Sequence, residues 1–566
     1  MKYLIPFFVG LAMTSYGQWT ENSTPNYLEL IEECKKFAEN DERIELYQMG
    51  DSDYGLPIYT LIVNGAQDST KTFEKARNST TILVNNAIHP GEPDGVNAML
   101  IWLKNYTSST ALNIQIPVVA FIPAYNVGGM MNRSGTSRAN QNGPEEYGFR
   151  GNAQNLDLNR DFIKMDSKNA FTFAKIYQAL DPDVFIDNHV TNGADYQYVF
   201  TLISALKHRL SPSMKESTYG KMVPELNRRM TQHGFPISPY VDMVGSTPDL
   251  GLRSFNDLPR YAMGYASLFS SFSFTVETHM LKPFPQRVEA TLKFFEEMLM
   301  YCQRNHKEIE KARNSSKAYY KSMSQFEHHF ELDTNKHSEI EFLGFEAKYK
   351  KSELTGLDRL YYDRNAPFKK QIPFYDTYKT QKSNPVPKFY IVERQAADII
   401  ERLKANNVEM DVLQRDSVFT VKGQKIVDFN SLSRPYENHF LHTDATVELI
   451  ETTKSFKKGD VLIKVDQERA FFIHSVLQAE AEDSYFSWNF MDSYLDQKEY
   501  FSPYVFEEIA VKILSQDDVL RKEFEAKQAA EPEFAKNQWA QLFYIYQRSE
   551  YYESKTHKNL PIYLHF

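Results

Sequence analysis

The feature that most constrains the fold is a short apolar run followed by a polar break and then by a helical pattern, all within residues 81–105. Residues 82–84 are the Ile-Leu-Val of a buried strand, and apolar residues recur at helical spacing over 96–103. His89 and Glu92 lie in the break between them. Turns at the carboxyl ends of strands form the ligand crevice of an open α/β sheet. The stretch therefore predicts a strand, a turn with two polar side chains at a ligand-binding edge, and a helix.

Two later apolar runs end in polar residues of the same kind. Residues 183–186 lead directly to Asp187-Asn188-His189, and residues 271–276 lead to Glu277. Helical patterns lie between several of the strand-like runs, so we expect a mainly parallel sheet with helices on both faces. The carboxyl ends of parallel strands meet at one edge. We therefore expect His189 and Glu277 to emerge beside the two polar residues of the first turn.

This combination of side chains matches the inventory of a catalytic zinc site. His89, Glu92 and His189 are ordinary zinc ligands, and three protein ligands leave the fourth position for water. The remaining carboxylate, Glu277, then serves as the general base for that water. A solvated turn or a core histidine would explain any one of these residues, but not four of them on one edge.

Asn159-Arg160 lies in the polar stretch 155–162. The planar guanidinium of an arginine matches a carboxylate in two parallel hydrogen bonds. Beside a zinc peptidase site, Arg160 would hold the free C-terminal carboxylate of a peptide. The alternative is a structural salt bridge to Asp157 or Asp161.

Taken together, these motifs resemble the zinc carboxypeptidase family, the family of pancreatic carboxypeptidase A. The matching residues occur in the family's order across about 27–304, and they are His89-Pro90-Gly91-Glu92, Asn159-Arg160, His189 and Phe274-Thr275-Val276-Glu277. The resemblance implies an α/β domain with a mixed sheet and one zinc ion. It also implies that His89, Glu92 and His189 bind the metal, that Glu277 is the base, and that Asn159 and Arg160 bind the terminal carboxylate.

The resemblance further implies a second arginine that steadies the oxyanion, contributed by the long loop over 132–154. A loop of this length in a compact domain is usually functional. Arg138 and Arg150 both qualify, and we favour Arg150 because its segment is closer to Asn159.

The sequence departs from the family pattern at two places. Asp161 follows Asn159-Arg160 where the family often has asparagine, so an additional carboxylate could weaken binding of an anionic chain end or orient Arg160. The substrate-binding tyrosine of the family would fall near Phe255, and Tyr261 or Tyr265 could take its place.

The N-terminus has the pattern of a secretory signal peptide. Lys2 precedes an apolar run over 3–13, and small residues follow up to Gly17, near which we expect cleavage. The run is too short to span a membrane, and no later stretch predicts a transmembrane segment. We therefore expect a secreted or periplasmic protein.

Length and charge set the remaining limits. A chain of 566 residues predicts two domains, and we place a catalytic domain at 18–310 and an accessory C-terminal α+β domain at 311–566, after the signal peptide at 1–17. The net charge of −10 argues against nucleic acid as the main partner. Cys34 and Cys302 could form one disulfide or remain two buried thiols.

The C-terminal part carries no second ligand set, no phosphate-binding glycine loop and no repeat. Residues 388–392, 461–465 and 470–473 have the pattern of strands, and 506–527 that of an amphipathic helix. This part resembles the extension found after some bacterial secreted members of the zinc carboxypeptidase family.

The sequence thus predicts a secreted zinc peptidase that removes residues from the C-terminus of peptides. Two alternatives remain open: a zinc amidase or endopeptidase that acts on peptidoglycan stem peptides, and a module that binds peptide or glycan without turnover. The oligomeric state is left open.

Overall fold

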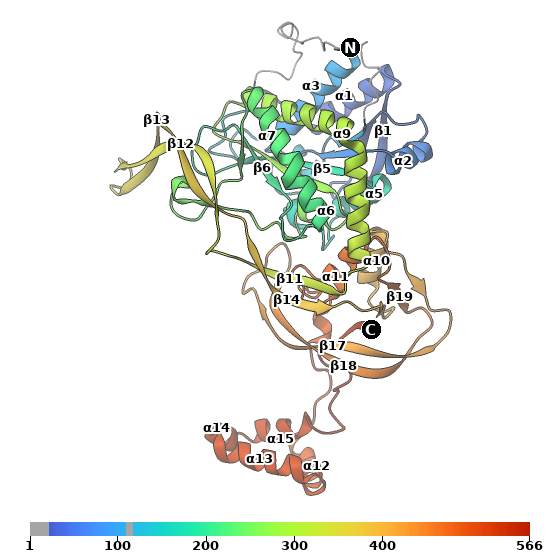
Figure 1. Cartoon of the computed structure of the whole chain (residues 1–566). Coiled ribbons are helices and arrows are strands. Elements are labelled where there is room, and N and C mark those ends of the chain that lie inside the picture. Colours follow the sequence, from blue (N-terminus) through green and yellow to red (C-terminus); the bar gives the residue numbers. More distant parts are fainter. Residues whose placement is uncertain (1–21, 109–116) are drawn as a thin grey trace. The chain divides into compact units, whose positions relative to one another are not determined.

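The structure is a computed structural model that describes residues 22–108 and 117–566 (Figure 1). The expected signal peptide with its cleavage near Gly17 lies outside the described residues. The chain divides into two compact units. The first comprises the chain up to residue 386 together with 402–408 and 466–474, and the second comprises 387–401, 409–465 and 475–566.

The centre of the first unit is an eight-stranded mixed sheet with the order β1-β2-β4-β3-β5-β10-β6-β7 (Figure 1). Its strands are β1 (Ile44–Asp51), β2 (Pro57–Val63), β3 (Thr81–Asn85), β4 (Val118–Ile122), β5 (Val184–Thr191), β6 (Phe200–Ser204), β7 (Ile237–Pro239) and β10 (Phe272–His279). The four central strands, β4, β3, β5 and β10, are mutually parallel, whereas β2 and β6 run antiparallel to their inner neighbours. The expected mixed sheet is confirmed.

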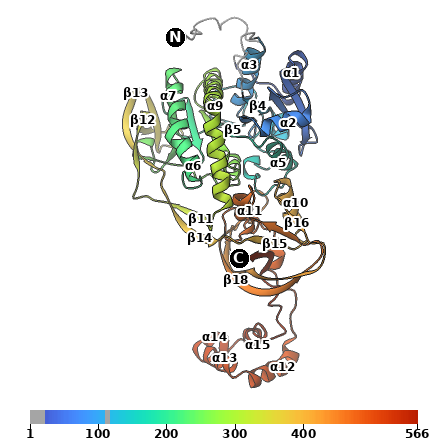
Figure 2. The same ribbon diagram turned by 45° about the vertical axis from the view of Figure 1, so that its right-hand side comes forward.

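Helices cover both faces of this sheet. They are α1 (Tyr27–Asn40), α2 (Ser69–Arg77), α3 (Asp94–Ser108), α5 (Lys168–Leu180), α7 (Val223–Gln232), α8 (Ala262–Ser267) and α9 (Phe284–Lys321). Phe121 of β4 shares a face with Ile186 of β5 through the register of β3, and Phe121 packs on Trp102 of α3 and Phe295 of α9. The next residue of β5, Phe185, points to the opposite face and packs on α5. In Figure 2, α9 lies between α3 and α7.

The first unit extends further than the expected catalytic domain. The boundary placed after residue 310 falls inside α9, a helix of 38 residues. Beyond α9, the hairpin of β12 (Ser338–Lys351) and β13 (Asp358–Tyr375) pairs with β9 (Leu252–Arg253), which itself pairs with β8 (Asp242–Met243). A second antiparallel pair, β11 (Gln325–Leu332) with β14 (Tyr378–Pro385), also belongs to this unit.

The second unit contains a six-stranded sheet with the order β16-β19-β15-β20-β17-β18. Its strands are β15 (Phe389–Val392), β16 (Asp411–Val412), β17 (Ser417–Ser431), β18 (His442–Phe456), β19 (Val461–Lys464) and β20 (Asn559–His565). The same unit holds four helices, α12 (Pro503–Gln516), α13 (Asp518–Ala530), α14 (Pro532–Ala535) and α15 (Gln538–Tyr546). Strands and helices are both present, as expected for an α+β arrangement.

Two expectations for the C-terminal half were wrong. Residues 470–473 begin the helix α11 (Ala470–Leu477) and do not form a strand, because a short apolar run has the same pattern in a buried helix. The helix expected over 506–527 is two helices that meet at Asp517. The Asp517 carboxylate accepts hydrogen bonds from the backbone N–H groups of Val519 and Leu520, and so starts α13.

Cys34 and Cys302 are both buried free thiols, so the expected alternative of a disulfide between them is not realised. Burial raises the pKa of both thiols. Among the described residues, no helix has the length and apolarity needed to cross a membrane.

Candidate metal centre

The turn between β3 and α3 directs His89 and Glu92 to the same side. The backbone N–H of Glu92 donates to the carbonyl of His89 at 2.8 Å. A side chain at Gly91 would come within 2.7 Å of Arg138 Cδ and 3.1 Å of the Gly148 carbonyl oxygen, so glycine permits the close approach of the long loop to this turn.

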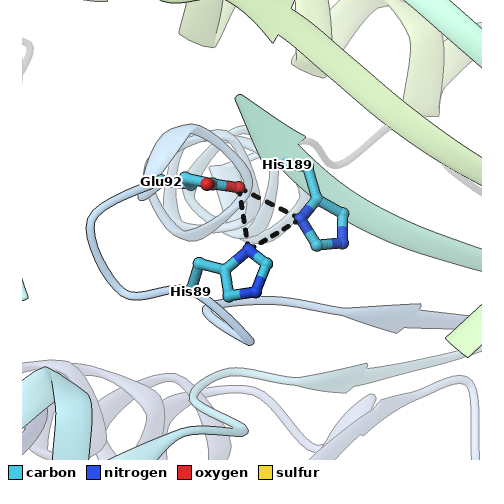
Figure 3. Close-up of side chains that lie close together, drawn as sticks. All are labelled: His89, Glu92 and His189. Carbon is cyan, nitrogen blue, oxygen red and sulfur yellow. Dashed lines mark hydrogen bonds and ion pairs between the residues drawn. The ribbon is translucent and has the colours of Figure 1, made fainter. Parts of the chain in front are cut away.

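His189 lies near the carboxyl end of β5 and meets the turn there. Figure 3 shows the side chains of His89, Glu92 and His189 pointing toward one another. Oε2 of Glu92 is 3.3 Å from Nδ1 of His89 and 3.0 Å from Nδ1 of His189, and the two Nδ1 atoms are 3.2 Å apart. All three residues are buried, and among the described residues they form the one group of histidine, cysteine and carboxylate side chains that could hold a metal ion.

The outer nitrogens of both imidazoles contact carboxylates. Nε2 of His89 is 2.9 Å from Oδ1 of Asp157, and Nε2 of His189 is 2.6 Å from Oδ2 of Asp187. A carboxylate accepts hydrogen bonds, so both Nε2 atoms carry protons and the neutral rings present bare Nδ1 lone pairs to Glu92. Three electron-pair donors at this separation repel one another unless a cation lies between them.

The distances suit zinc. Ligand atoms about 2.0–2.1 Å from a common tetrahedral centre lie about 3.3 Å from one another. The three observed separations of 3.0–3.3 Å are close to that value. The residues present therefore fit one zinc ion.

The electrostatics of the centre also favour a cation. Burial opposes a charge on His189, but Asp187 and Glu92 outweigh it and raise the pKa of the imidazole well above its usual value. Burial likewise opposes ionisation of Glu92, but Arg138 and His89 hold the pKa of this carboxyl well below its usual value. The centre is thus surrounded by carboxylates that stabilise positive charge within it.

Glu277 lies beside this centre because β10 pairs in parallel with β5, with Glu277 opposite His189 in the register. Its side chain lines the same cavity, and its Oε2 is buried without a hydrogen-bond partner among the described residues. Burial and the charge of Glu92 raise the pKa of Glu277 to about 8, against the opposing charge of His189. An unpartnered carboxylate oxygen in a cavity can accept a proton from a molecule bound there.

Both candidate arginines of the long loop reach the cavity. Arg138 donates to Oε1 of Glu92 at 2.6 Å and to the carbonyl of Val190 at 3.1 Å. Arg150 donates from Nε to Oδ2 of Asp157 at 2.9 Å. The side chain of Arg150 is 45% exposed and that of Arg138 is 15% exposed, so Arg150 presents more of its guanidinium to the cavity.

Asn159 and Arg160 line the cavity on a short 3-10 turn, Leu158–Arg160. The amide oxygen of Asn159 accepts from the backbone N–H of Ala262 at 3.0 Å, which fixes its orientation. The guanidinium of Arg160 stacks over the ring of Tyr261, 4.5 Å from the centroid, and donates to the Asn159 carbonyl at 2.8 Å. Arg160 is 3.9 Å from Asp157, so the ion pair weighed as its alternative role is also present.

Asp161, the residue that departs from the family pattern, is not among the side chains that line the cavity. It is fully buried, pairs with Nζ of Lys164 at 2.8 Å and accepts from the backbone N–H of Ser167 at 3.0 Å. The additional carboxylate is thus neutralised in the protein interior and does not face a ligand.

The cavity has a volume of about 440 Å³ and an aromatic wall. The wall consists of Tyr240, Phe255 and Tyr261, in which Phe255 contacts the ring of Tyr240 at 5.9 Å and that of Tyr261 at 5.2 Å. Tyr261, one of the two tyrosines considered from the sequence, therefore lines the cavity. Tyr265 does not, since it is buried and donates to Asn406.

Sequence reasoning missed three residues of this site. Tyr240 lies between the short strands β7 and β8, where no pattern distinguishes it. Asp157 and Asp187 had a detectable signal, because each precedes a site residue by two positions. They were interpreted as a salt-bridge partner and as part of a polar setting, and their contacts with the ligand histidines were not foreseen.

Comparisons with known proteins point in the same direction. The model of the zinc carboxypeptidase family matches residues 30–192. A comparison with curated proteins returned no match.

Several solved metallocarboxypeptidases are similar in structure. A metallo-carboxypeptidase from Pseudomonas aeruginosa, solved in complex with (2-guanidinoethylmercapto)succinic acid, is 15% identical with a TM-score of 0.37, and the alignment covers 50% of this chain and 68% of that one. A metallo-carboxypeptidase from Burkholderia cenocepacia is 14% identical with a TM-score of 0.37, covering 49% and 69%. Carboxypeptidase A from Helicoverpa armigera is 13% identical with a TM-score of 0.36, covering 52% and 74%.

The family match covers the turn with His89 and Glu92, the long loop, Asn159-Arg160 and His189. Its members are metallopeptidases that use one zinc ion, and the buried set described above can hold one. This chain therefore carries a zinc carboxypeptidase domain, which the family match places over residues 30–192.

Proposed function

We propose that this protein is a secreted or periplasmic zinc carboxypeptidase that hydrolyses the last peptide bond of peptide substrates. The observation that carries the proposal is the convergence of the His89, Glu92 and His189 set with Glu277 and Arg160 in one cavity. When bound, zinc supplies Lewis-acid polarisation of the scissile carbonyl and of a water molecule.

Glu277 is the proposed general base. Its unpartnered Oε2 accepts the proton of the attacking water and returns it to the leaving nitrogen. The pairing of β10 with β5 keeps this carboxylate beside the ligand His189.

Asn159 and Arg160 are proposed to bind the free carboxylate at the end of the peptide. A guanidinium forms two parallel hydrogen bonds with a carboxylate, and stacking on Tyr261 orients the plane of Arg160. Such a contact places the last peptide bond, and not an internal one, at the metal centre.

Arg150 is the proposed donor to the oxygen that gains negative charge during attack. Arg138 is the weaker candidate because its guanidinium is already bound to Glu92 and to the Val190 carbonyl. A preoriented donor in a cavity of this kind stabilises charge that develops only in the transition state.

Export rests on the signal-peptide pattern before Gly17, and an accessory role for the C-terminal part also remains a proposal. The family match supports peptides as substrates and gives no support to peptidoglycan peptides.

The decisive experiment compares two peptides of the same sequence, one with a free and one with an amidated C-terminus. We expect one zinc ion per chain and chelator-sensitive release of the last residue from the free acid alone. Equal cleavage of both peptides would show that the enzyme is not a carboxypeptidase. Bound zinc without hydrolysis of either peptide would identify a binding module.

A further inference from the structure

One buried guanidinium joins three segments that each carry a residue of the candidate site. It belongs to Arg287 in the first turn of α9, and its side chain is fully buried. Six hydrogen bonds leave it, two to a carboxylate and four to backbone carbonyls. None of its partners is a metal ligand.

The first segment is the beginning of α3, directly after the turn that carries Glu92. Nε and Nη2 of Arg287 donate to the two carboxylate oxygens of Asp94 at 3.0 and 3.3 Å. The hydroxyl of Thr278, the residue after Glu277, donates to the same carboxylate. Asp94 therefore connects the ligand turn to the strand of the proposed base.

The second segment is the long loop, and the third is the end of β10. Arg287 donates to the carbonyls of Asn142 at 3.1 Å and Gly143 at 2.9 Å, within the part of the loop between the two cavity arginines. It also donates to the carbonyls of Met280 and Lys282, each at 3.1 Å. The N–H of Asn142 donates in turn to the Met280 carbonyl at 2.8 Å, which ties the loop to the strand end.

No other side chain could make this set of contacts. An arginine has five N–H donors in a rigid planar fork, and here every arm of the fork is used. A lysine has three donors at one point and cannot reach all three segments. The ion pair with Asp94 offsets the cost of burying the charge, so loss of the guanidinium leaves a buried carboxylate unpaired.

We propose that Arg287 is a positioning residue for the metal centre, which sets the placement of Glu92, Glu277 and the loop arginines relative to one another. The inference rests on the proposed function, because it assigns Arg287 a role in that same site. It predicts that zinc binding and turnover depend on Arg287 beyond its contribution to stability.

The chain offers a matched control in the same helix. Arg313 of α9 is also buried and donates to Asp181 at 2.9 Å, Asp183 at 2.8 Å and the Ser270 carbonyl at 3.1 Å. These partners precede β5 and β10, whereas those of Arg287 lie at the carboxyl end of β10 and in the segments beside it. The two arginines therefore fix opposite ends of the same part of the sheet, and Arg287 alone is next to the cavity.

The experiment compares Arg287→Lys with Arg313→Lys in the full chain. Thermal unfolding is measured for both variants, zinc affinity by competition with a chelator, and kcat and KM separately. We expect both variants to unfold at lower temperature. Only Arg287→Lys should raise the Kd for zinc, by about 10–100-fold as for groups that orient metal ligands, and lower kcat more than it changes KM.

Asp94→Asn is the milder test if Arg287→Lys does not fold, since it keeps the shape and removes the charge that faces Arg287. It should weaken zinc binding in the same direction. An equal zinc Kd for the folded Arg287 or Asp94 variant and for Arg313→Lys would overturn the inference. Failure of the wild-type chain to bind zinc or to hydrolyse peptides would instead overturn the proposed function.

Discussion

Replacing Asp187 by asparagine tests whether negative charge behind His189 holds the metal. Oδ2 of Asp187 is 2.6 Å from Nε2 of His189, and Oδ1 accepts from the side-chain amide of Asn85 at 2.9 Å. The amide oxygen of Asn85 is buried without a hydrogen-bond partner. If the Asn85 amide turns over, it can accept from the new amide nitrogen at 187. Both hydrogen bonds then survive Asp187→Asn, and only the charge is lost.

The expected magnitude follows from that exchange. A hydrogen bond to a charged group contributes about 1.5–3 kcal/mol and a neutral one about 0.5–1.5 kcal/mol. The difference of about 1–1.5 kcal/mol corresponds to a zinc Kd about tenfold higher in Asp187→Asn. The larger loss is expected for Asp157→Asn.

Asp157 has no neighbour that can turn to accommodate an amide. Its Oδ1 accepts from Nε2 of His89 and from the backbone N–H of Asn159, each at 2.9 Å, and its Oδ2 accepts from Arg150. In either orientation, an asparagine here points its NH₂ group at one of these donors. We therefore expect Asp157→Asn to raise the zinc Kd by about 100-fold, the upper end of the range for such groups.

The assay is competition for zinc between each variant and a chelator of known affinity, at constant pH and with unfolding followed in parallel. Asp183→Asn is the control, because Asp183 is buried at the opposite end of β5 and contacts no ligand. It should lower stability without changing zinc affinity. Equal zinc affinity in wild type, Asp187→Asn and Asp157→Asn would refute the reasoning, as would a larger loss at 187 than at 157.

Three further predictions concern the catalytic groups and the stability of the fold. Glu277→Gln should keep one zinc ion and lower kcat by about 10²–10⁴-fold, and a full rate would remove Glu277 from the mechanism. Arg160→Met should lower kcat/KM for free-acid peptides by about 10–100-fold, since a charged hydrogen bond of about 1.5–3 kcal/mol is lost, and an unchanged rate would contradict its role as carboxylate binder. Burial opposes ionisation of Asp181, but Arg313 and Lys317 hold its pKa below the usual value. Its contribution to stability is therefore complete above the unfolded pKa and is lost as pH falls below about 5. Urea unfolding should show Asp181→Asn destabilised at pH 7, with a smaller difference at pH 3.5; a constant difference would exclude this cause.

The central strands could be predicted from the sequence because each is a short apolar run between polar turns. Residues 82–84, 118–122, 183–186 and 271–276 were recognised in this way, and the structure has β3, β4, β5 and β10 there. Pattern alone failed where an apolar run is equally compatible with a helix, as at 470–473. It also gave no sign that the hairpin of β12 and β13 joins the first unit, since pairing with β9 is a contact between segments far apart in the chain.

The residues gathered at the cavity were partly predictable for a related reason. A polar side chain directly after a buried strand must emerge at the sheet edge, and His89, His189 and Glu277 all satisfy that condition. Tyr240 and Phe255 reach the cavity from irregular segments beside β8 and β9, so their position depends on tertiary packing. Arg287 was not detectable at all, because four of its six acceptors are backbone carbonyls, which leave no trace in the sequence.

The register of β10 against β5 connects the metal centre to the stability of the sheet. Successive residues of a strand point to opposite faces, so a slip of one residue would remove Glu277 from the cavity while leaving His189 in place. Arg313 binds the residues before both strands, and Arg287 binds the carbonyls after β10. Both arginines extend from α9, so a single helix fixes the register from its two ends. The helix thereby determines whether the ligand and the proposed base face each other, although it contributes no side chain to the cavity.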